Sequence, residues 1–129
     1  MVADPAAAED RSEWHRCRHW IEAALHYARG THTIEDIEDG IARGQFVFWS
    51  GKRCAIITEI IHYPRARVMH YFLIGGDLKE LVEYMEPRIT AWAKSQGCHA
   101  VSGAGRPGFE RVFAKSGFKP AWRVIFKEI

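Results

Sequence analysis

The chain has 129 residues, 47% of them hydrophobic and 26% charged, which is the composition of an ordinary globular domain. This excludes a disordered, collagen-like or disulfide-scaffold protein, and a formal net charge of +2 gives no reason to expect a nucleic-acid or membrane partner. No stretch approaches the roughly 18 apolar residues of a membrane span, and the N-terminus lacks a signal-peptide pattern. Three cysteines lie far apart in the sequence and predict reduced thiols: Cys17, Cys54 and Cys98. These features together favour a cytoplasmic protein.

The N-terminal part predicts a flexible tail and two helices. Residues 1–11 are rich in Ala, Asp and Glu without periodicity, so the single domain is expected over residues 12–129. Apolar residues at helical spacing predict a first helix that Gly30 ends: Trp14, Cys17, Ile21, Ala24, Leu25 and Ala28. Thr33 and Asp36 have the spacing of a capping box and predict the start of a second, short helix.

Three strands are predicted next. β-branched and aromatic residues dominate 45–49, 53–63 and 67–74, and turn residues such as those at 50–52 and 64–65 separate them. Because the turns are short, we expect an antiparallel meander in which 53–63 pairs with 67–74.

Helices and strands alternate in the last part of the chain. A long helix is predicted from residue 78 to Gly97, and Pro87 should kink it or divide it in two. A short strand over 98–102 and a last helix over 109–116 follow. Residues 122–129 alternate apolar and charged side chains and predict a half-buried terminal strand. This order implies an α/β fold with a mixed, mostly antiparallel sheet and helices on both faces.

The element order and three short motifs resemble the GNAT superfamily of N-acyltransferases. Many members carry a segment reading roughly A-x-x-L-Y-x-K-x-G-F, and residues 112–118, Val-Phe-Ala-Lys-Ser-Gly-Phe, are similar to it. Residues 91–98 resemble a helix end of the family. Residues 105–109, Gly-Arg-Pro-Gly-Phe, resemble a stretch of small GNAT-like proteins from tailed phages and prophages. The resemblance spans residues 12–129 and implies a GNAT-like fold.

The resemblance also implies where acetyl-CoA would bind. Family members open the sheet between two strands for the pantetheine arm and hold the pyrophosphate at the N-terminus of the next helix. The corresponding residues are Ile74, Gly75, Gly76, Asp77 and Leu78. The family's (Q/R)-x-x-G-x-(G/A) pattern is incomplete there, and the Asp77 carboxylate would repel phosphates, so we expect acetyl-CoA binding to be weak or absent. The alternative is a plain strand-to-helix turn with Asp77 as the helix cap.

The catalytic residues implied by the resemblance are also incomplete. A family tyrosine often protonates the leaving thiolate, and that position holds Phe113, which we expect to be buried against the last strand without a polar partner. Glu59 is the candidate general base, because burial among isoleucines would raise the pKa of its carboxyl. The alternative is that Glu59 faces solvent on an edge strand.

Histidines offer two further candidates. His15 and His19 have helical spacing, but Arg16 and Arg18 lie between them and oppose a cation, so no metal site is predicted. His62 and His70 flank the turn at 64–65 and are expected to face each other across the hairpin.

Two functions therefore stand side by side. The first is an acetyl-CoA-dependent N-acyltransferase with a degenerate cofactor loop. The second is a non-catalytic GNAT-fold protein, virion-associated or cytoplasmic, whose partner is a phage particle or a host protein. Fold alone does not decide between them, and the sequence names neither an acceptor nor an oligomeric state.

Overall fold

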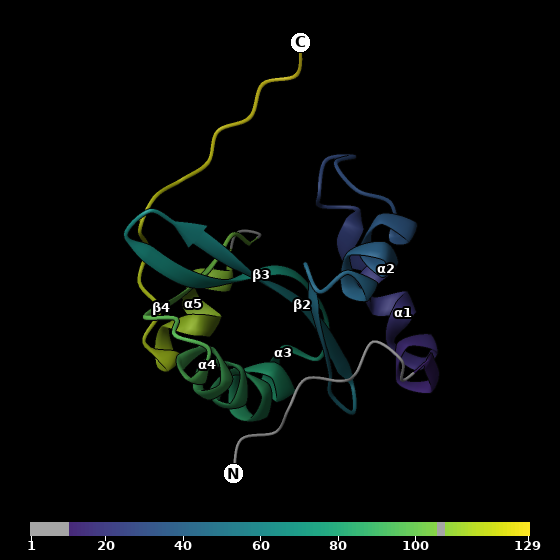
Figure 1. Cartoon of the computed structure of the whole chain (residues 1–129), viewed down its shortest axis with the longest axis horizontal. Helices are drawn as coiled ribbons and strands as arrows, with labels where there is room; N and C mark the ends of the chain where they lie inside the picture. Colours follow the sequence, from purple (N-terminus) through teal and green to yellow (C-terminus); the bar gives the residue numbers. More distant parts are fainter. Residues whose placement is uncertain (1–10, 106–107) are drawn as a thin grey trace.

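Four strands form one mixed sheet in the computed structural model, which describes residues 11–105 and 108–129 (Figure 1). Strands β1 (Val47–Ser50), β2 (Cys54–Tyr63) and β3 (Ala66–Gly76) make the predicted antiparallel meander. The expected pairing of 53–63 with 67–74 is thus confirmed. Strand β4 (Ala100–Gly103) lies parallel to β3 at the end of the sheet.

Two helices cover one face of this sheet. Helix α1 (Arg11–Leu25) includes Arg11, so the predicted tail of residues 1–11 is wrong at that residue; residues 1–10 lie outside the described residues. It ends before Gly30, because residues 26–28 bond as turns. Helix α2 (Ile34–Ala42) has the predicted capping box: the backbone N–H of Asp36 donates to Thr33 Oγ1 at 3.3 Å, and that of Thr33 donates to Asp36 Oδ2 at 2.8 Å.

The helical segment between β3 and β4 crosses the other face. It consists of α3 (Leu78–Glu80), a π-helical turn η1 (Leu81–Met85) and α4 (Glu86–Ser95). The expected division at Pro87 is confirmed, since proline has no N–H to donate and its ring crowds the preceding turn. The backbone widens there, so that the N–H of Glu86 donates to the carbonyl five residues back, at Leu81. No helix in the described part of the chain is long and apolar enough to cross a membrane.

A short helical segment follows β4 on the same face. Helix α5 (Phe109–Phe113) continues as a 3-10 turn η2 (Ala114–Ser116), which together match the span of the predicted last helix. Gly117 ends it in the left-handed conformation, with φ of 90°. Helices therefore lie on both faces of the sheet, as predicted.

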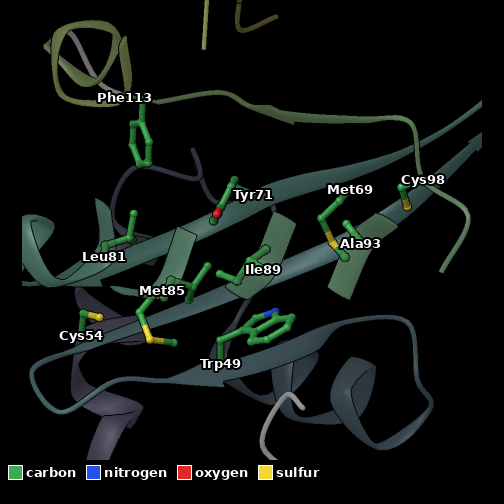
Figure 2. Close-up of a cluster of buried hydrophobic side chains, with 11 residues drawn as sticks. Trp49, Cys54, Met69, Tyr71, Leu81, Met85, Ile89, Ala93, Cys98 and Phe113 are labelled. Atoms are coloured by element: carbon green, nitrogen blue, oxygen red, sulfur yellow. The ribbon is translucent and has the colours of Figure 1, made fainter. Parts of the chain in front are cut away.

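Each face of the sheet has its own hydrophobic core. The core under α1 and α2 contains Cys17, Ile21, Ile37, Phe46, Phe48, Ala55, Ile57 and Leu73. The core under α4 and α5 is drawn in Figure 2 and includes Trp49, Ile56, Met69, Tyr71, Leu81, Met85, Ile89 and Phe113. Thr58 is also fully buried, and its hydroxyl accepts from the Trp49 indole N–H at 3.0 Å, so this buried polar group has a hydrogen-bond partner.

The prediction of a half-buried terminal strand is wrong. Residues 122–129 are extended and leave the body of the domain without a strand partner in the described chain (Figure 1). Trp122 is 76% exposed and Ile125 is 90% exposed. An alternating pattern buries one side only if it pairs with a strand under a covering layer, and residues 122–129 pair with no strand of the described chain.

Gly76 is a point of close approach in the sheet. It has a φ of 95°, and a Cβ atom placed on it would lie 2.4 Å from the carbonyl oxygen of Arg53. The last ladder position, Cys54 opposite Gly76, therefore requires glycine both for its backbone conformation and for its space.

We predict that Gly76→Ala lowers the free energy of unfolding by about 2–4 kcal/mol, since it adds a steric clash to the strain of a positive φ. Gly44→Ala is the matched control: Gly44 has a φ of 79° but open space around it, so only the cost of the conformation, about 1 kcal/mol, is expected. Urea denaturation measures both variants. Equal losses would contradict the close contact at Gly76.

Candidate functional site

The sheet opens between β3 and β4. The two strands pair only from Val68 opposite Ala100 to Tyr71 opposite Gly103, whereas β3 continues to Gly76. The β2–β3 register shifts by one residue at this point, so Phe72 has no opposite residue on β2. Such a bulge bends the strand and increases its twist. The last part of β3 therefore presents backbone groups toward an edge that no described strand occupies.

The two glycines of the expected cofactor segment lie in the sheet. Gly75 and Gly76 belong to β3 and pair with Ala55 and Cys54. A Cβ on Gly75 would lie 2.4 Å from the carbonyl oxygen of Trp20 in α1. Packing alone therefore explains why both positions are glycine, without a ligand at this place. Ile74 and Leu78 are half-buried on either side.

Asp77 caps the helical segment, as the alternative interpretation predicted. Its Oδ1 accepts from the backbone N–H of Lys79 at 2.9 Å, and its own N–H donates to the Arg53 carbonyl at 2.8 Å. Two of the N–H groups at this helix start are therefore already bonded. They are the groups that a phosphate at a helix N-terminus would use.

The β1–β2 turn brings cations to the same place. Arg53 Nε lies 3.9 Å from Asp77 Oδ2. Lys52, which precedes Arg53, and Lys79, two residues after Asp77, are both exposed. Glu80 accepts from the backbone N–H groups of Lys52 and Arg53 at 2.9 and 2.7 Å, which ties the turn to the helix. No local sequence pattern reveals this cluster, because the residues lie some 25 positions apart and only the register of β2 on β3 brings them together.

A histidine and a serine meet at the mouth of the opening. His70 Nδ1 lies 3.0 Å from Ser102 Oγ, one position before the last paired residues of β3 and β4. Glu59 is opposite His70 on β2. Burial lowers the pKa of the His70 imidazole, and the nearby charge of Glu59 raises it in part. The ring is therefore neutral at pH 7 and can accept a proton.

The structure changes the expected surroundings of Glu59 and of His62 on this hairpin. Glu59 is half-buried and lies beside a histidine rather than alone among isoleucines. The expectation that His62 faces His70 is wrong: His62 pairs with Arg67, three positions from the Glu59–His70 pair along the ladder. The β3–β4 pairing, which no local pattern reveals, is what identifies His70 and Ser102.

Phe113 is buried, as predicted, with 7% of its surface exposed. Aromatic rings surround it instead of a terminal strand: its centroid lies 5.3 Å from that of Phe118 and 6.0 Å from that of Tyr71. The Tyr71 hydroxyl is buried and has no hydrogen-bond partner among the described residues. Burial and the charge of Glu86 raise the pKa of Tyr71.

Metal and thiol chemistry find no support in the described residues. They contain no group of three or more His, Cys, Asp and Glu side chains that could hold a metal ion. The three cysteines are free and buried. Burial raises the pKa of each thiol, that of Cys54 to about 12, so none is a thiolate at neutral pH.

The 103–108 loop contains residues 106–107 of the phage-like stretch, which lie outside the described residues.

The comparisons with known proteins point to one fold. An aminoglycoside N-acetyltransferase in complex with CoA superposes with a TM-score of 0.69 and 13% identity, over 98% of this chain and 92% of that one. A "predicted acetyltransferase" from Clostridium acetobutylicum, solved with acetyl-CoA, gives 0.66 and 14%, over 99% and 96%. A ribosomal-protein-alanine N-acetyltransferase from Brucella melitensis gives 0.65 and 10%, over 100% and 99%.

The fold of this chain is therefore that of the GNAT acetyltransferases. No protein-family model matches the sequence, and no curated protein matches it either. At such low identity the likeness fixes the arrangement of helices and strands, and the chemistry has to be argued from the residues of the site.

We predict that the imidazole of His70 titrates below the ordinary histidine pKa of about 6.5, because burial penalises the charged ring. Glu59→Gln should lower this pKa further, since it removes a charge that favours the imidazolium. Glu83→Gln, on the exposed side of η1, is the control and should not change it. Nuclear magnetic resonance titration of the ring protons measures all three proteins.

The same shift predicts a direction for stability. The unfolded chain binds a proton near pH 6.5 that the folded protein binds only at lower pH, so the free energy of unfolding should fall as pH drops below about 6.5. A His70 pKa at or above the ordinary value would contradict the burial of the ring.

Proposed function

We propose that this protein is an N-acyltransferase that uses acetyl-CoA and has a weak cofactor loop. The observation that carries the proposal is the open edge of β3 beyond Tyr71, in a fold shared with enzymes solved with CoA and acetyl-CoA. The pantetheine arm contains amide groups, and it would bond to this edge as a short added strand does. The half-buried Ile74 would lie beside it.

The pyrophosphate would lie at the start of the helical segment. The helix dipole and the cations Lys52, Arg53 and Lys79 favour an anion there. Asp77 opposes it, both by its charge and because it already occupies the Lys79 N–H. The Glu80 carboxylate, which accepts from the backbone N–H groups of Lys52 and Arg53, adds a second negative charge there. The balance of these effects supports binding that is weaker than in a site with free N–H groups.

His70 would act as the general base. Its neutral ring would take the proton from an amine as the amine nitrogen attacks the thioester carbonyl, so that a C–N bond forms and the C–S bond breaks. Ser102 holds the ring through Nδ1, and Glu59 would stabilise the imidazolium. Because Phe113 has no proton to give, CoA would leave as the thiolate, which water then protonates.

A second function is favoured by one set of observations. The bonded N–H groups of Asp77 and Lys79, together with Phe113, are what a GNAT-fold protein without catalysis would show. Such a protein would bind another protein, on a phage particle or in a host.

We predict that the wild type binds acetyl-CoA more weakly than about 100 µM, and that Asp77→Asn binds roughly tenfold more tightly, equivalent to about 1.4 kcal/mol. Asparagine keeps the helix cap and removes the charge. Asp39→Asn, an exposed carboxylate of α2 paired with Arg43, is the control and should bind like the wild type. Isothermal calorimetry gives all three constants.

Two results would decide the matter. Micromolar binding by the wild type would show that the cofactor loop is fully competent and that the repulsion by Asp77 is overestimated. No binding by either protein would overturn the acyltransferase proposal and leave the protein-binding function.

We further predict that His70→Gln lowers kcat about a hundredfold and removes the acidic limb of the pH–rate profile, with little change in the KM for acetyl-CoA. The exposed His62→Gln is the matched control and should keep the wild-type rate. Release of CoA is followed with three amine classes: an aminoglycoside, a peptide with N-terminal alanine and a polyamine. An unchanged profile in His70→Gln would exclude it as the base.

A further inference from the structure

Three polar side chains form one row across the sheet, and each belongs to a different strand. Glu59 of β2 lies opposite His70 of β3, and His70 lies opposite Ser102 of β4. Residues that are directly opposite in neighbouring strands project from the same face of a sheet. The three side chains therefore stand side by side in the order carboxylate, imidazole and hydroxyl.

This row contains the chemical groups of a hydrolytic triad. In such a triad a hydroxyl lies within hydrogen-bond reach of a base, and a carboxylate orients the base. Here Ser102 Oγ lies 3.0 Å from His70 Nδ1, and the charge of Glu59 acts on the same ring. Because triads are defined by geometry and roles rather than by sequence position, the wide spacing of the three residues in the chain is no obstacle.

The direction of proton transfer follows from the two neighbours of the ring. Burial keeps the His70 imidazole neutral at pH 7, so one of its two nitrogens carries a proton and the other accepts. Glu59 lies on the β2 side of His70, and Ser102 lies on its β4 side. A carboxylate only accepts hydrogen bonds, so Glu59 favours the ring proton on Nε2, the nitrogen that does not contact Ser102. Nδ1 then accepts the proton of the Ser102 hydroxyl.

Ser102 is also within reach of a substrate. It is half-buried and belongs to the lining of a cavity of about 1160 Å³ that extends to Phe109 and Phe113 of α5. Gly103 and Ala104 follow it in this lining. Since β4 is the last strand of the sheet, its outer edge carries unpaired backbone N–H groups. Such groups are the donors that stabilise the negative oxygen of a reacting carbonyl.

We propose that Ser102 is the nucleophile of a second activity, the hydrolysis of activated acyl esters and thioesters through an acyl-serine intermediate. Ser102 Oγ attacks the carbonyl carbon while its proton moves to His70 Nδ1, so that a C–O bond forms and the bond to the leaving alcohol or thiol breaks. The ring gives this proton to the leaving oxygen or sulfur. Water then attacks the acyl-serine, its proton moves through Nδ1 to Ser102 Oγ, and a carboxylic acid leaves.

The hydrolysis shares His70 with the proposed acyl transfer but does not require CoA. In the transfer, His70 takes the proton of an amine, whereas in the hydrolysis it takes the proton of Ser102. Glu59 does not contact the acyl group in either reaction. It is a positioning residue, whose charge orients the ring and stabilises the imidazolium.

Hydrolysis of 4-nitrophenyl acetate, without CoA or an amine, tests the activity. We expect the wild type to release about one nitrophenolate per chain in an initial burst, and the rates of Ser102→Ala and His70→Gln to fall about a hundredfold. Ser95→Ala changes an exposed serine of α4 and is the matched control, which should behave like the wild type. Ser102→Cys keeps a nucleophile at the same place and should retain the burst. A wild type without a burst, or a wild-type rate in Ser102→Ala, would overturn the proposal.

A fluorophosphonate probe identifies the nucleophile, because the attacking serine oxygen displaces fluoride and stays bound to phosphorus. We expect peptide mass spectrometry to find the label on Ser102 of the wild type and no label in Ser102→Ala. Glu59→Gln should be labelled more slowly but to the same final extent, whereas Glu83→Gln should be labelled at the wild-type rate. Label on Ser102 in a protein that binds no acetyl-CoA in calorimetry would support the hydrolysis and remove only the proposed transfer. An unmodified Ser102 would overturn the proposal in favour of a hydrogen bond that only joins β3 to β4.

Discussion

The ladder between β2 and β3 is the interaction on which the rest of this structure depends. It runs from Cys54 opposite Gly76 to Tyr63 opposite Ala66, and it separates the two hydrophobic cores. Its register places Glu59 beside His70 at one point and Arg53 beside Asp77 at another. A slip of one residue would send every side chain to the opposite face, so both halves of the site would be lost together.

The bulge at Phe72 marks the point where β3 becomes an edge of the sheet. From Val68 to Tyr71, β3 is paired on both sides; after the bulge, β3 is paired with β2 alone. The strand β3 therefore passes from the interior of the sheet to its edge while β2 remains its partner throughout. His70 and Ser102 lie just before this transition, where paired strands hold a side chain firmly beside an open space.

Local patterns predicted the meander, the capping box at Thr33 and the break at Pro87, because each depends on residues close in sequence. The candidate site was harder to predict. The alternative interpretation of Asp77 as a cap follows from its own position, but the His70–Ser102 contact and the approach of Lys52 and Arg53 to the helix depend on pairing across many residues. Residues 122–129 show the converse error: their alternation is a strand pattern, yet pairing requires a partner that the pattern does not contain.

The lengths of the strands have a consequence for how the protein behaves when crowded. The inner strands have 10 and 11 residues, whereas the outer strands β1 and β4 have 4 each. A short outer strand offers few backbone groups to an unrelated chain, so a stray segment gains little by docking there without matching side chains. The short outer strands therefore disfavour the edge-to-edge strand pairing that leads to fibres, although the two central strands are long and strongly apolar.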